Sequence, residues 1–179
     1  MLKIIVPGIE YYDERTNEFV YYKDQVLQLE HSLVSISKWE STWHKPFLSD
    51  KEKSPEEILD YVRCMTITQN VGPDVYLRLT EQNFLDINSY IENSMTATTF
   101  SNDKRSGGRE IITSEIIYYW MISFNIPFEC QKWHLNRLLT LIKVCNIKNS
   151  PPKKMSKTEM MNRNRALNAA RKQQLNTKG

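Results

Sequence analysis

The N-terminal part of the chain consists of short β-branched and aromatic runs separated by polar residues, a pattern typical of β-strands. Leu2–Val6 is rich in β-branched residues, and two aromatic runs within residues 10–22 flank a polar stretch at residues 13–18. Aromatic and β-branched runs around a polar turn predict a β-hairpin, and residues 26–29 could extend the same small sheet. We therefore expect residues 1–30 to be β-rich.

After this segment, apolar residues recur at intervals of three and four, which predicts helices. A first helix begins near Ser32 and ends before Pro46. A second helix runs from Pro55 to about residue 67, because Ser54 and Glu57 form a capping box around its first turn. We expect the apolar face of this second helix to consist of Ile58, Leu59, Val62 and Met65.

Further helices are predicted in the second half of the chain. A short helix over residues 74–79 is followed by a helix capped by Thr80, and residues 94–109 lack helical spacing and predict a loop. Residues 115–124 are apolar almost all round, which predicts a central core helix. A second long helix over residues 127–146 would complete an αα-hairpin with it.

The predicted fold class is mainly α (α+β), with a β-rich part at residues 1–30 and a helical bundle at residues 32–147. Residues 1–149 form the globular body, because the two prolines after Ser150 cannot continue a helix. Residues 150–179 form a basic C-terminal tail, in which a second capping box predicts a helix over residues 157–175.

Charge is distributed unequally along the chain, whose net charge is +3. Residues 148–179 carry nine Lys or Arg and one acid, a net charge of +8, so residues 1–147 carry −5. This asymmetry favours an anionic partner for the tail, which could be a phosphate backbone, an acidic protein or an anionic lipid, and the alternative is a solvated tail that only improves solubility. The tail has no aromatic residue to stack on a base, which favours a protein or plain phosphate contact over base recognition. The candidate partner-binding residues of the tail are Lys153, Lys154, Arg163, Arg165, Arg171 and Lys172.

An aromatic cluster at the end of the first helix is the other candidate partner-binding site. Trp39 and Trp43 are four residues apart and lie on one helix face, and Phe47 follows just past the end of the helix. Two interpretations are open. The cluster could be part of the core, or it could form a hot spot for a partner protein.

No motif in the chain points to catalysis or to a cofactor. The sequence contains no nucleophile elbow, P-loop, dinucleotide fingerprint or zinc-protease motif, so we expect a protein that is not an enzyme and needs no cofactor. Cys130 and His134 could face one metal ion, but they lack a third ligand at suitable spacing, so a buried histidine is the simpler interpretation. The three cysteines form no paired motif and are expected to be small buried hydrophobes. No apolar stretch reaches the ~18 residues needed to cross a bilayer.

Three strings in the sequence resemble a family of small proteins encoded in the structural-gene region of tailed bacteriophages. They are SLVSISKWESTWHKPFLS at residues 32–49, ITSEIIYYWMISFNIPFECQKWHLNRLLTLIKVCNIKN at residues 112–149, and the ending NRALNAARKQQLNTKG. Some members of this family are associated with tail assembly chaperones of long-tailed phages. The resemblance spans most of the chain.

The resemblance implies a non-enzymatic protein in the cytoplasm of an infected bacterium. Such a chaperone would coat a long helical tape-measure protein, recruit tail-tube subunits and leave before the virion matures. The alternative is a permanent virion component, a head-to-tail connector or minor tail protein, whose basic arm contacts DNA or a neighbouring subunit. A small DNA-binding regulator is a third hypothesis, although no recognition-helix arrangement is evident. Oligomerisation stays open.

Overall fold

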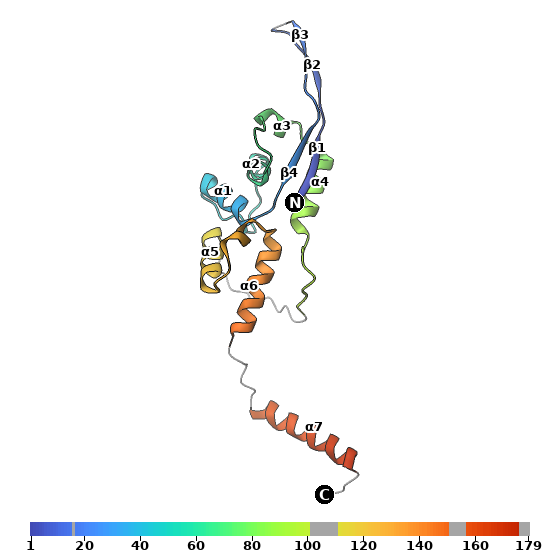
Figure 1. Cartoon of the computed structure of the whole chain (residues 1–179), viewed down its shortest axis with the longest axis vertical. Helices are drawn as coiled ribbons and strands as arrows, with labels where there is room; N and C mark the ends of the chain where they lie inside the picture. Colours follow the sequence, from blue (N-terminus) through green and yellow to red (C-terminus); the bar gives the residue numbers. More distant parts are fainter. Residues whose placement is uncertain (16, 101–110, 151–156, 176–179) are drawn as a thin grey trace. The chain divides into compact units, whose positions relative to one another are not determined.

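The computed structural model describes residues 1–179 apart from 16, 101–110, 151–156 and 176–179, and it describes residue 159 by its backbone alone. The chain divides into two compact units, Met1–Asn146 and Ile147–Gly179, three residues before the boundary that the sequence predicts after residue 149. Its helices and strands in chain order (Figure 1) are β1 (Leu2–Val6), β2 (Glu10–Asp13), β3 (Glu18–Tyr21), β4 (Gln25–Leu29), α1 (Leu33–Trp43), α2 (Pro55–Met65), α3 (Pro73–Leu77), α4 (Glu81–Glu92), α5 (Ser114–Ser123), the 3-10 helix η1 (Phe128–Lys132), α6 (Leu135–Asn149) and α7 (Lys157–Leu175).

The predicted mainly α fold with a small N-terminal β-structure is confirmed. The strands form two antiparallel pairs, β1 with β4 and β2 with β3, instead of one sheet. In the first pair Leu2 lies opposite Leu29, and the pattern of buried side chains alternates along both strands. This alternation turns Ile4, Val6, Leu27 and Leu29 into the core.

Local capping explains where three of the helices begin. The Ser32 side chain accepts from the Ser35 amide at α1, the Ser54 side chain from the Glu57 amide at α2, and the Thr80 side chain from the Asn83 amide at α4. In each case the second side chain bonds back to the backbone of the first residue, so two amide groups at the helix start are satisfied together. The predicted starts of these helices are therefore confirmed.

One hydrophobic core fills the first unit, between the β1–β4 pair and the helices. Its largest fully buried side chains come from β1, β4, α1, α2, α5 and α6. They include Trp39, Leu27, Leu29, Leu33, Ile36, Met65, Ile117, Met121, Leu135 and Leu138. The segment after α2 is hydrogen-bonded to β4, since the Ile67 amide donates to the Gln28 carbonyl at 2.8 Å.

Two expectations for the second half of the chain were wrong. The helix α5 is a surface helix, in which Ile117 and Met121 are buried against the core while Tyr119 is 65% and Ile122 is 61% exposed. One side of α5 faces the core, where it packs against α1 and shares a cavity lining with α6, while its other side faces solvent. The second long helix does not begin at residue 127, because the chain first forms η1 and then an extended segment at Trp133.

A backbone contact displaces the start of α6. His134 forms an isolated antiparallel bridge with Ser32, and the Leu135 amide donates to the His31 carbonyl at 2.7 Å. These contacts hold the segment before α6 in an extended conformation against the start of α1. Helices α5 and α6 still lie side by side, since Trp120 and Phe124 share a cavity lining with Leu139 and Ile142.

The second unit contains α7, whose described side chains are all exposed to solvent. The helix agrees with the predicted range of residues 157–175. Of the predicted loop at residues 94–109, the described part lies outside every helix and strand, and residues 101–109 fall outside the described residues. Within the described part of the chain, no helix is both long and apolar enough to span a membrane.

Candidate partner-binding groove

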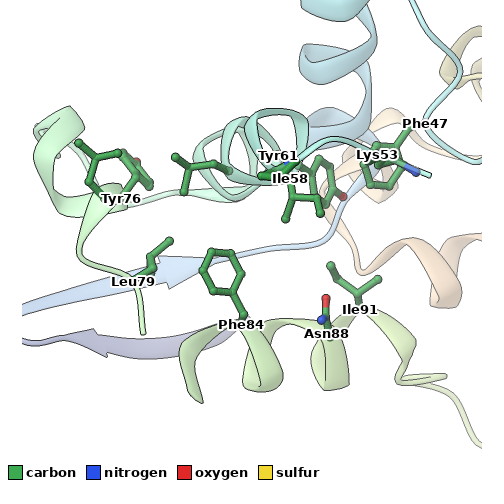
Figure 2. A pocket seen from close by; sticks show the side chains of 12 residues that line it. Phe47, Lys53, Ile58, Tyr61, Tyr76, Leu79, Phe84, Asn88 and Ile91 are labelled. Carbon is green, nitrogen blue, oxygen red and sulfur yellow. The ribbon is translucent and has the colours of Figure 1, made fainter. Parts of the chain in front are cut away.

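An open apolar groove lies between α2, α3 and α4 of the first unit. Its cavity volume is about 600 Å³, which is in the range of pockets that hold sizeable apolar groups. Figure 2 shows Phe84, Asn88 and Ile91 rising from α4 on one side, opposite side chains of α2 and of the segment after α1. The groove is lined by Phe47, Lys53, Pro55, Ile58, Leu59, Tyr61, Tyr76, Leu77, Leu79, Phe84, Asn88 and Ile91.

The groove exposes aliphatic side chains that a closed core would cover. The predicted apolar face of α2 is wrong at Ile58, which is 41% exposed, because α1 covers the side of α2 that carries Tyr61 and Val62 instead. On α3, Leu77 is 77% exposed. Branched side chains exposed together beside a hollow indicate a surface for a partner or ligand.

Aromatic rings form one end of the groove. The Phe47 ring lies 4.0 Å from the Tyr61 ring and 5.1 Å from the Trp39 ring, measured between centroids. The Lys53 ammonium nitrogen lies 4.6 Å from the Phe47 centroid, a cation–π contact. Lys53 therefore places a positive charge at this end, and the lining residues include no carboxylate.

The three aromatic residues that the sequence grouped together also lie together in the structure, with the Trp39 ring 6.2 Å from the Trp43 ring and 5.1 Å from the Phe47 ring, but they differ in exposure. Trp39 is 1% exposed, and its indole nitrogen donates to the Glu57 carbonyl at 2.9 Å. Trp43 is partly buried and donates to the Asp60 carboxylate at 2.9 Å. Of the three, Phe47 alone lines the groove. Core packing therefore accounts for Trp39, and partner contact stays a prediction for Trp43 and Phe47.

A buried carboxylate fixes the position of Phe47. Glu40 Oε1 accepts from the Phe47 amide at 2.8 Å, and Oε2 accepts from the Ser114 amide at 2.8 Å and from the Ser114 hydroxyl at 2.5 Å. Because the Thr113 side chain makes no capping hydrogen bond, Glu40 supplies the cap for α5 from a distant helix. No local sequence pattern indicates this role of Glu40, because its partners lie up to 74 residues away in the chain.

His31 and His134 are far apart in the sequence but lie next to each other in the core. The His31 and His134 rings lie 5.1 Å apart between centroids. His31 Nδ1 lies 2.5 Å from the Tyr61 hydroxyl, and His134 Nε2 lies 2.9 Å from the Tyr90 carbonyl oxygen. Burial and then the neighbouring His134 lower the pKa of His31 to about 4. Burial also lowers the pKa of His134. The pair is therefore uncharged near neutral pH.

The three cysteines lie in the hydrophobic core or pack against it. Cys130 is buried as expected, while Cys64 and Cys145 are partly buried, and all three are free thiols. Burial and then Asp60 raise the pKa of the Cys64 thiol to about 11, which disfavours the nucleophilic thiolate. Cys130 and His134 lie on different segments, and the described residues contain no group of three or more potential metal ligands among His, Cys, Asp and Glu.

The candidate residues of the basic tail lie on α7 where the structure describes them. Arg163, Arg165, Arg171 and Lys172 are exposed to solvent. Lys153 and Lys154 fall outside the described residues. The structure therefore presents the α7 cations at the surface, as an electrostatic contact requires.

Comparison with known proteins adds no further constraint. No protein-family model, curated protein or solved structure matches the chain. The assignment of a function therefore depends on the groove, on the charges and on the resemblance described above.

Proposed function

We propose that this protein is a non-enzymatic assembly chaperone that holds an amphipathic helix of a longer partner in the groove between α2, α3 and α4. The observation that carries the proposal is the open apolar groove with Ile58 and Leu77 exposed at its edge. A long helix with an apolar stripe aggregates unless that stripe is covered, and a groove of this kind covers it.

The charges favour an acidic partner helix. Lys53 is the charged side chain among the lining residues, and it lies beside the Phe47 ring. An acidic residue flanking the apolar stripe of the partner would meet Lys53 at the aromatic end of the groove. The exposed cations of α7 would add attraction for the same class of partner.

The phage resemblance supplies the identity of the partner in this proposal. A tape-measure protein is a long helical chain, and a tail assembly chaperone would keep it soluble until tail-tube subunits arrive. Under the proposal, contact through the groove is reversible, because the chaperone leaves before the particle matures. The protein would then act in the cytoplasm of the infected bacterium.

The test is co-expression with the tape-measure protein encoded beside it, followed by co-purification. Ile58→Glu and Leu77→Glu place a carboxylate in the groove, and each should weaken binding roughly tenfold or more. Both residues are exposed, so the variants should stay folded. Ile122→Glu is the matched control, because the exposure of Ile122, 61%, falls between those of Ile58 and Leu77, and Ile122 lies on α5 and is not part of the groove lining.

Two results would contradict the proposal. One is a tape-measure protein that is equally soluble with and without this chain and never co-purifies with it. The other is a small apolar molecule retained in the purified protein, detected by native mass spectrometry, with no helix binding. Many copies in purified mature particles would favour the permanent virion component instead.

A further inference from the structure

Residues 9–22, which we call the aromatic arm, form a two-stranded hairpin that makes no contribution to the core. The arm consists of β2 and β3, and Figure 1 shows it extending beyond the helices of the first unit. None of its described side chains is buried. An isolated two-stranded hairpin is at best marginally stable in water, and its unpaired edges invite another chain. The arm therefore has the properties of a binding surface.

The strand register places three aromatic residues of the arm on one face of the hairpin. Tyr12 lies opposite Phe19 and Tyr21 lies opposite Glu10, so all four side chains share one face of the ribbon. The Tyr12 and Phe19 rings are 5.1 Å apart between centroids. Phe19 is 59% and Tyr21 is 68% exposed. Large rings exposed on one face bind cationic and apolar side chains well.

The arm is also acidic. It contains four acidic residues and one arginine, a net charge of −3. Asp13 lies directly opposite Glu18 across the two strands, a like-charge pair that opposes hairpin formation. The salt bridges among the described residues include none of the four acids of the arm. A basic partner would relieve this repulsion.

The helix α7 has the complementary chemistry. Residues 157–175 carry five bases and one acid, a net charge of +4. Met161, Arg165 and Lys172 are spaced by four and seven residues, so they lie on one stripe of the helix. Met161 is 55% exposed, and Arg165 and Lys172 are exposed as well. The stripe thus offers cations and a flexible thioether, both of which pack favourably on aromatic rings.

We propose that the aromatic arm of one copy binds α7 of a second copy. Arg165 and Lys172 would lie over the Tyr12, Phe19 and Tyr21 face, which also carries Glu10, and the other acids of the arm would attract them at longer range. Each chain carries one arm and one α7, so the contact joins copies head to tail and produces rings or open chains. The inference rests on the arm and α7, and it does not depend on an occupied groove.

Charge reversal tests the contact from both sides. In the arm variant Glu10, Glu14 and Glu18 are changed to Lys, and in the tail variant Arg165, Arg171 and Lys172 are changed to Glu. Sedimentation velocity on the full chain should show association that weakens by about tenfold or more in either variant alone. Raising NaCl from about 0.05 M to about 0.5 M should weaken the wild-type association in the same way.

Mixing the two variants is the decisive measurement. The reversed arm of the first and the reversed tail of the second attract each other again, so the mixture should associate although neither variant does alone. A chain that carries both sets of changes should recover self-association. Asp50, Glu92 and Glu129 changed to Lys make a control with the same change in net charge, because these exposed acids lie outside the arm. This control should associate as the wild type does.

Three outcomes would overturn the proposal. The wild type could remain monomeric at all concentrations, the mixture of variants could fail to associate, or the control could lose association as fully as the arm variant. None of these results bears on capture of a helix in the groove, since Ile58 and Leu77 are unchanged in every variant. Loss of the chaperone activity in the groove variants, with self-association intact, would conversely leave this proposal standing.

Discussion

Single buried polar side chains connect parts of this fold that are distant in the sequence. Glu40 joins α1 to the Phe47 segment and to the start of α5 through three hydrogen bonds. His31 and His134 join the β4–α1 junction to the start of α6, with Tyr61 and Tyr90 as their partners. Each of these groups is buried, so the loss of a hydrogen bond would leave an unsatisfied donor or acceptor.

The histidine pair predicts that acid weakens the fold. Because the pKa of His31 is lowered from 6.5 to about 4, the unfolded chain binds more protons between these values. Above pH 6.5 the His31 ring is uncharged in both the folded and the unfolded chain, and the fold keeps its full stability. As pH falls from 6.5 towards 4, the unfolded chain takes up the proton first, and the free energy of unfolding decreases progressively. Between about pH 7 and about pH 5 we expect the free energy of unfolding to fall by about 2 kcal/mol.

Urea unfolding at several pH values measures this effect. His31→Gln should flatten the dependence on pH, whatever its effect on stability at neutral pH. His44→Asn serves as the control, because His44 is exposed and its left-handed backbone, with φ of 52°, suits Asn. An unchanged slope in the His31 variant would assign the acid sensitivity to other groups.

At the scale of elements, the two β-pairs meet at a crowded junction. A Cβ atom on Gly8 would lie 2.2 Å from the Tyr22 carbonyl oxygen, so only glycine permits this close approach of the strands. The adjacent Tyr22 amide donates to the Ile9 carbonyl at 2.8 Å and begins the pairing of the aromatic arm. The Gly8 amide also donates to Asp24 at 2.7 Å. The junction thus aligns the arm with β1 and β4.

Substitution at Gly8 should loosen the arm and spare the rest of the chain. We expect Gly8→Ala to accelerate amide hydrogen exchange throughout β2 and β3, with a local destabilisation of roughly 1–3 kcal/mol. Gly72→Ala is the matched control, because its new Cβ would meet the mobile side-chain oxygen of Asp74, which can move aside. If amide exchange in β2 and β3 is equally fast in the two variants, the close backbone approach at Gly8 does not determine the stability of the arm.

Features encoded by neighbouring residues were predictable from the sequence. The capping box of Ser54 and Glu57 requires residues three apart, and the hairpin requires two strand-forming runs around one turn. The start of α6 was not predictable, because Pro127 suits a helix start while the deciding contact is with His31, far away in the chain. The exposure of Tyr119 was missed for a related reason, since composition does not reveal how many sides of a helix are covered.

The candidate site was predictable only in part. Phe47 was identified from its aromatic neighbours, but the groove combines it with residues of three further helices, and no local pattern signals that combination. The charge on the tail could be counted directly, whereas the roles of Glu40 and of the histidine pair depend on tertiary contacts. Sequence patterns therefore located the elements more reliably than the surfaces that they form together.

At the scale of the whole molecule, the core belongs entirely to the first unit. All of the buried hydrophobic residues among those described lie between Ile4 and Ile142. The described side chains of α7 are exposed, and they include five bases and several isolated apolar residues. The second unit therefore contributes surface and charge, and the first unit contributes the folding free energy.

Truncation after residue 149 should accordingly leave the stability of the body unchanged. We expect the melting temperature to shift by less than about 2 °C, since no described core residue is removed. Leu138→Ala is the positive control, because it creates a cavity and should cost roughly 2–5 kcal/mol. Differential scanning calorimetry distinguishes the two cases, and a large drop on truncation would place core contacts in the removed segment.

The distribution of chromophores follows from the same partition between the units. Every Trp, Tyr and Phe of the chain lies in the first unit, and the last of them is Trp133. Intrinsic fluorescence and near-ultraviolet circular dichroism therefore contain no signal from the basic helix itself. Any change in emission when that helix binds must therefore come from rings outside the second unit, so a contact between the helix and an aromatic surface can be followed without a label.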